Sequence, residues 1–92
     1  MKTTILEYVR ERRKGKEQKV GVLLAERKGD KVFTGWSRCN LKEGDKFDQE
    51  QGINIAHVRL THDDYVPQSM QKKMRRFQKR CSKYFKGATV IS

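Results

Sequence analysis

The last third of this 92-residue chain constrains the fold most, because it carries a single apolar stripe at helical spacing. The stripe recurs every three or four residues and consists of Met70, Met74, Phe77, Cys81, Tyr84 and Phe85. This period is typical of an amphipathic helix with one side buried. Pro67 suits the first turn of that helix, and Gly87 suits a left-handed residue at its end. The pattern predicts a helix of about 19 residues, or ~29 Å, that packs on the rest of the protein.

The charged residues on the opposite side of the same helix are all cations. They are Lys72, Lys73, Arg75, Arg76, Lys79, Arg80, Lys83 and Lys86, and residues 67–92 contain no acidic side chain. Like charges four residues apart destabilise a helix by roughly 0.2–0.5 kcal/mol per pair. A phosphate backbone would neutralise this face and release condensed counterions. The face therefore predicts nucleic-acid binding; the alternative is a surface that only keeps the protein soluble.

Charge is distributed unevenly along the chain, whose net charge is +11. Residues 1–28 hold nine basic and four acidic side chains, residues 29–66 hold five and seven, and residues 67–92 hold eight and none. Asymmetry of this kind favours a binding surface. The N-terminal excess forms a second basic cluster, whose candidate nucleic-acid contacts are Arg12, Arg13, Lys14 and Lys16. The alternative is a charged loop that protects a strand edge.

The first forty residues have the pattern of strands. Residues 3–12 mix β-branched and aromatic side chains, which favours a strand and leaves a short helix as the alternative. Residues 14–18 have the composition of a loop, and residues 20–25 form a short apolar run. A turn containing Gly29 leads to a returning strand over residues 32–37. This order predicts a three-stranded antiparallel meander with one face available for helices.

A second helix is expected after Phe47. Two apolar series fall at roughly helical spacing, namely Phe47, Ile55 and Val58, and Ile53, Ala56 and Leu60. Asp45 or Asp48 can cap its first turn. The sequence reveals no structural role for Arg59, which is therefore a candidate for an ion pair or a ligand contact.

These elements predict one α+β domain over residues 1–92, a three-stranded antiparallel sheet packed by two helices. The C-terminal helix is the long and basic one. The apolar residues 88–92 can dock on an edge of the sheet.

The chain offers pieces of metal and catalytic sites without their usual spacing. Cysteine and histidine occur as Cys39, His57, His62 and Cys81, which lack the paired spacing of a zinc site. Carboxylates that could belong to a metal-dependent nuclease are Asp45, Asp48, Glu50, Asp63 and Asp64. Helix capping accounts for such aspartates. We therefore expect no enzyme, no metal and no cofactor, with a small nuclease as the third functional alternative.

The sequence also bears on location. It begins without an apolar signal segment, and it contains no apolar run near the ~20 residues that span a membrane. Two cysteines in such a chain are typical of reduced thiols. We expect a cytoplasmic protein without a membrane partner.

Three segments together resemble a family of small basic proteins of tailed bacteriophages. They are GWSRCN at 35–40, GDKFDQEQGINIAHVR at 44–59 and VPQSMQKKMRRFQKRCSKYF at 66–85. The family pattern is G-W-S-x-C-N, then D-x-F-x-x-x-x-G-x-x-I-A-x-x-R, then a basic helix that begins with proline. The family has no secure activity, so the resemblance implies a setting: a phage early protein in a bacterial cytoplasm that binds nucleic acid or inhibits host machinery.

The leading functional prediction is weakly sequence-specific binding to DNA or RNA through phosphate contacts. The alternative is a phage-encoded inhibitor that binds an acidic host protein. The sequence leaves open the choice between DNA and RNA, the identity of a host target and the oligomeric state.

Overall fold

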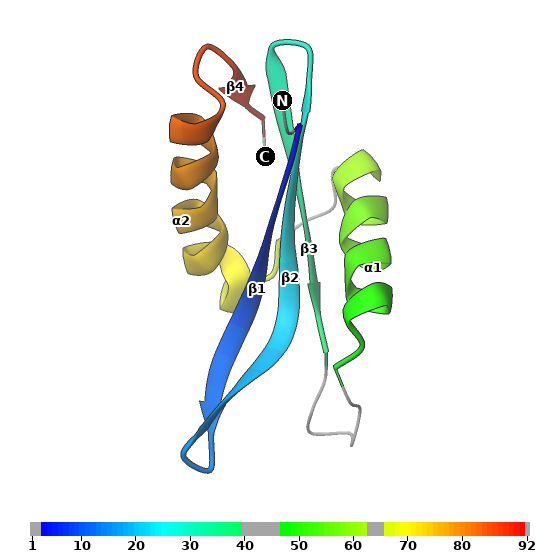
Figure 1. The fold of residues 1–92 in the computed structure, drawn as a ribbon, viewed down its shortest axis with the longest axis vertical. Coiled ribbons are helices and arrows are strands. Elements are labelled where there is room, and N and C mark those ends of the chain that lie inside the picture. Colours follow the sequence, from blue (N-terminus) through cyan, green and yellow to red (C-terminus); the bar gives the residue numbers. More distant parts are fainter. Residues whose placement is uncertain (1–2, 40–46, 63–65, 92) are drawn as a thin grey trace.

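A sheet lies between two helices in the computed structural model, which describes residues 3–39, 47–62 and 66–91 (Figure 1). The elements are β1 (Thr4–Arg13), β2 (Lys16–Lys28), β3 (Lys31–Arg38), α1 (Gln49–His62), α2 (Gln68–Tyr84) and β4 (Thr89–Val90). The strand order is β1-β2-β3-β4, with antiparallel pairing among the first three strands and parallel pairing of β4 with β3. The predicted α+β class with two helices is confirmed, but the sheet is mixed and has a fourth strand.

The fourth strand is the docked C-terminal segment. Thr89 N donates to Asp30 O at 2.7 Å, and Ile91 N donates to Val32 O at 2.8 Å. The expectation that residues 88–92 dock on a sheet edge is therefore confirmed for the described residues.

The hairpins form where glycine permits a positive φ. Lys14 and Gly15 have φ values of 51° and 76°, a pair that matches the twist of the strands in a two-residue hairpin. The predicted loop over residues 14–18 is too long, because Lys16 already belongs to β2. Gly29, with φ of 63°, forms the predicted turn between β2 and β3.

Both faces of β2 are covered, since α1 and α2 lie on opposite sides of the sheet (Figure 1). Every residue from Val20 to Ala25 is buried. The prediction that one face of the meander takes the helices is wrong. A continuous apolar run is typical of a strand buried on both faces, whereas a strand with one wet face alternates.

Small residues bring α1 directly onto β3. A Cβ atom at Gly35 would lie 2.0 Å from the carbonyl oxygen of Ala56, so only glycine fits there. Ala56 and Leu60 are buried, whereas Ile55 and Val58 are 37% and 53% exposed. Of the two predicted apolar series, the one with Ala56 and Leu60 faces the core.

The predicted cap of α1 is Asp48, whose Oδ1 accepts a hydrogen bond from the backbone N–H of Gln51 at 3.1 Å. Asp45, the other candidate, lies outside the described residues.

The stripe of α2 fills the core on the other face, with Met70, Met74, Phe77, Cys81 and Phe85 all buried. Tyr84 departs from the prediction, because it is 53% exposed. The helix has 17 residues, two fewer than expected, because Pro67 takes the N-cap position with ψ of 152° and Phe85 takes the C-cap position. Gly87 has the expected positive φ, 84°, in the turn that follows the C-cap Phe85.

Candidate nucleic-acid interface

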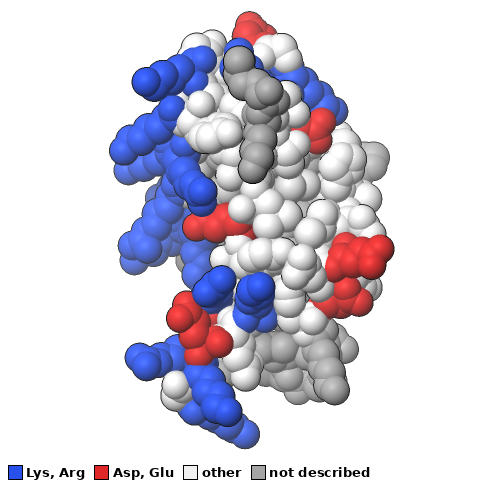
Figure 2. All heavy atoms as spheres, in the orientation of Figure 1, with Lys and Arg blue, Asp and Glu red and all other residues white. Residues whose placement is uncertain are grey.

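The cations of α2 lie on the side of the helix that points away from the sheet. This cationic face of α2 consists of Lys72, Lys73, Arg75, Arg76, Lys79, Arg80, Lys83 and, just beyond the helix, Lys86. Seven of the eight side chains are exposed, and Lys73 is half-buried. Figure 2 shows Lys and Arg gathered along the side of the molecule that α2 occupies. The structure thus brings together all the predicted contacts on this helix.

One member of the face has an acidic partner within the protein. Arg80 Nη1 lies 3.4 Å from Glu7 Oε2 of β1, and both side chains are largely exposed. Exposed pairs of this kind stabilise a fold by about 0–1 kcal/mol, so Arg80 stays available to an external anion. Among the described residues no other cation of the face pairs with a carboxylate.

The termini of α2 do little to stabilise it. Its N-cap, Pro67, makes no side-chain hydrogen bond, and its first turn contains no acidic residue that would favour the helix dipole. Lys83 in the last turn is the favourable exception. Packing of the buried stripe therefore has to offset both the missing cap and the repulsion among the cations.

The second predicted cluster lies at the tip of the β1–β2 hairpin, which extends past the end of α2 (Figure 1). Arg12, Lys14 and Lys16 are exposed, and Arg13 ends β1 with its side chain outside the described part. A register shift at Val9 and Arg10 marks a bulge where the hairpin leaves the core. Figure 2 shows cations of the hairpin on the same side of the molecule as those of α2.

Acidic side chains interrupt the hairpin cluster. Glu17 is the cross-strand partner of Arg12, and Glu11 accepts a hydrogen bond from Arg38 at 2.5 Å. The hairpin is thus the weaker of the two predicted contact surfaces.

Arg59 has a structural role that the sequence did not reveal. Its guanidinium carbon lies 3.7 Å from the centre of the Trp36 ring, and its Nη1 donates to the Trp36 carbonyl at 3.2 Å. Both contacts tie α1 to β3, beyond the short stretch of β3 that pairs with β4. These contacts give Arg59 a structural role that requires no ligand.

Residues from the first two segments of the phage resemblance gather at the same junction. A Cβ atom at Gly52 would lie 3.2 Å from Ser37 Oγ, and Gly35 lies under Ala56. Asn40 and Asp45 of the pattern lie outside the described residues. The first two segments of the pattern therefore describe how α1 packs on β3, whereas the third segment is α2 itself, which carries the cations.

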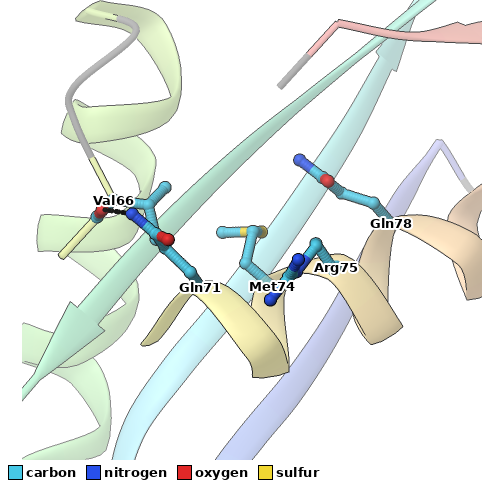
Figure 3. A pocket seen from close by; sticks show the side chains of 5 residues that line it. All are labelled: Val66, Gln71, Met74, Arg75 and Gln78. Atoms are coloured by element: carbon cyan, nitrogen blue, oxygen red, sulfur yellow. Dashed lines mark hydrogen bonds between the residues drawn. The ribbon is translucent and has the colours of Figure 1, made fainter. Parts of the chain in front are cut away.

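A shallow groove that the sequence did not predict borders the cationic face. It measures about 230 Å³ and is lined by Val66, Gln71, Met74, Arg75 and Gln78 (Figure 3). Gln71 Nε2 donates to the Val66 carbonyl at 3.2 Å, and Gln78 Nε2 donates to Thr34 Oγ1 at 3.5 Å. The sequence feature that could have indicated this groove is the pair Gln71 and Gln78, seven residues apart on one flank of the apolar stripe, with Arg75 between them.

The cysteines and acidic groups were the candidates for metal or catalytic chemistry. Burial raises the pKa of the Cys81 thiol to about 11; the charge of Arg80 opposes this rise, and Glu7 adds a smaller upward contribution. Within the described ranges no three His, Cys, Asp or Glu side chains come together as a metal site would need. Asp63, Asp64 and the side chain of His62 lie outside those ranges.

No helix in the described part of the chain is both long and apolar enough to span a membrane. Comparison with protein-family models, with curated proteins and with solved structures gives no match to this chain.

Proposed function

We propose that this protein binds nucleic acid through phosphate contacts on the cationic face of α2, assisted by the β1–β2 hairpin. The observation that carries the proposal is a set of eight cations, seven on α2 and Lys86 just beyond it. Seven of the eight are exposed, and one has a carboxylate partner among the described residues. Phosphate groups neutralise such a surface whatever the base sequence of the nucleic acid. The resemblance to phage proteins supports action in the cytoplasm of an infected bacterium.

Helix geometry supports repeated phosphate contacts. Lys72, Arg76, Lys79 and Lys83 follow one another at intervals of three or four residues, so their side chains form a row along α2. At ~1.5 Å per residue, the 17 residues of α2 span about 26 Å. The row itself, from Lys72 to Lys83, covers about 17 Å of that length and can follow consecutive phosphates. Arg76 in the row, with Arg75 and Arg80 beside it, adds planar donors that suit phosphate oxygens.

Charge reversal on α2 tests the proposal. The double variant Arg76→Glu, Lys79→Glu should lower affinity for DNA or RNA at least 100-fold, because two attractive contacts become repulsive. Fluorescence anisotropy with labelled duplex DNA, single-stranded DNA and RNA measures the change. Circular dichroism checks that the variant keeps its fold.

A matched control places the same charge change on the other side of the molecule. Lys28→Glu, Lys31→Glu alters two exposed lysines at the β2–β3 turn, where Lys28 lies over Phe33 of the core beneath α1. We expect a loss of less than tenfold, from the change in net charge alone. Equal losses in the two double variants would rule out α2 as the contact face.

A protein target is the competing outcome. Purification of the tagged protein from nuclease-treated bacterial lysate should return no partner in stoichiometric amount. An acidic protein captured there, and released by the α2 double variant, would replace nucleic acid as the ligand.

A further inference from the structure

We infer that the groove beside α2 receives the base of an unpaired nucleotide whose phosphate lies on the cationic face. The inference rests on the proposed function, because the groove gains a nucleotide ligand only if α2 holds the backbone. It names the class of nucleic acid that the protein prefers: one with a bulged, looped or single-stranded nucleotide.

The groove joins the cationic face through Arg75, which belongs to both (Figure 3). Its guanidinium is exposed, whereas Gln71 and Gln78 on either side of it along the helix are half-buried against Val66 and Thr34. A phosphate held by Arg75 would therefore place the attached sugar and base at the opening of the groove. No rearrangement of the helix is needed for that contact.

The lining suits the edge and the face of a base. The Gln71 amide orientation is fixed, since its nitrogen donates to a backbone carbonyl, and its oxygen remains as an acceptor. Such an oxygen accepts a hydrogen bond from the exocyclic amino group of adenine, cytosine or guanine. Val66 and Met74 supply apolar surface beneath a ring. At about 230 Å³ the groove is smaller than the ~300–1,000 Å³ of sites for drug-sized ligands, and suits a single base.

Shape favours an unpaired base over the edge of a base pair. Base edges of a duplex lie recessed in its grooves, and side chains that read them must project outward. Gln71 and Gln78 instead lie half-buried in a concavity at the flank of α2. A concave surface accepts a group that projects from the nucleic acid, as a base turned out of the stack does.

Three labelled ligands of matched sequence test the inference at one salt concentration: a duplex, the same duplex with one bulged adenine, and a single strand. The wild type should bind the bulged duplex at least fivefold more tightly than the perfect duplex. In Gln71→Ala, Gln78→Ala that preference should disappear, while affinity for the perfect duplex stays within twofold. The control Gln51→Ala, on the exposed side of α1, should keep the preference.

Equal affinity of the wild type for bulged and perfect duplex would overturn the inference and leave the proposed function standing. A preference that survives in the Gln71, Gln78 double variant would also overturn it. Failure of the wild type to bind any of the three ligands would overturn both proposals.

The methionines give a second readout that does not depend on a variant. Met70 and Met74 are both buried in the stripe, but Met74 lines the groove and Met70 does not. A base in the groove should shift the methyl NMR signal of Met74 more than that of Met70 on titration with the bulged duplex. An unmoved Met74 signal at saturation contradicts a base in this groove.

Discussion

The two helices cover opposite faces of one sheet but differ in how they pack and in what they expose. Helix α1 places Gly52, Ala56 and Leu60 inward, and its backbone meets β3 at Gly35. Helix α2 packs through large side chains such as Met70 and Phe77. The two helices also differ in charge: α1 contains one Glu and one Arg, whereas α2 contains seven cations and no acidic residue.

This contrast separates a helix that completes the fold from the helix that we propose binds nucleic acid. A helix that only has to complete a fold can approach the sheet closely and carry mixed polar groups, as α1 does. The repulsion along α2 lowers the stability of the helix, and neutralisation by an external anion would offset that loss. Of the three segments that carry the phage resemblance, the first two lie at the junction of α1 and β3, and the third is α2 with its cations.

The largest expected effect is on the close packing of α1. Gly35→Ala would bring a Cβ atom to 2.0 Å from Ala56 O, so α1 has to move away from β3. We expect a loss of about 3 kcal/mol in the free energy of unfolding, measured by urea denaturation.

A neighbouring substitution on the other face serves as the control. Thr34→Ser removes one methyl group beside Gln78 of α2 and should cost about 1 kcal/mol. If Gly35→Ala costs no more than Thr34→Ser, α1 does not depend on the close approach, and the contrast between the helices weakens.

The next effect concerns the core beneath α2, which contains a titratable group. The folded-state pKa of Cys81 is about 11, above the ordinary 9.0. The neutral thiol therefore contributes stability that is fully present below pH 9 and is lost as the pH rises through 11. The free energy of unfolding of the wild type should fall relative to Cys81→Ala by roughly 2 kcal/mol between pH 8 and pH 11.

Parallel curves for the two proteins over that range would show that the Cys81 thiol titrates normally. The core beneath α2 would then be open to water, in conflict with its packing.

A smaller effect should reveal the repulsion on α2 directly. Arg76→Glu replaces like-charge neighbours three and four residues away with attractive ones, including Lys72 and Lys79. We expect about 1 kcal/mol of added stability in low salt, together with weaker nucleic-acid binding. The same type of change on α1, Asn54→Glu, should add none, because its neighbour Glu50 is acidic. A destabilised Arg76→Glu protein would mean that the cations are already balanced within the fold.

Much of the fold was predictable because its signals are local. The stripe of α2, the turn at Gly29 and the cap at Asp48 each depend on residues close in sequence. The structure bears out all three, except that Tyr84 of the stripe is exposed. The placement of helices on both faces was missed, although the unbroken apolar run Val20–Ala25 indicates a strand covered on both sides.

The missed features depend on contacts between residues distant in sequence. The stacking of Arg59 on Trp36 and the ion pair of Arg80 with Glu7 join segments that only the folded chain brings together. The groove at Gln71 and Gln78 likewise forms between α2 and the segment at Val66. The cationic face was predictable, since a helix period and a charge count are enough to define it.

The salt dependence of binding tests the central claim most directly. If about six cations of α2 and the hairpin engage duplex phosphates, log affinity should fall against log salt concentration with a slope near −5. A series of anisotropy titrations between low and physiological salt gives the slope for the wild-type protein. A slope close to zero, or no binding at the lowest salt, would contradict the claim that the cationic face of α2 meets a phosphate backbone.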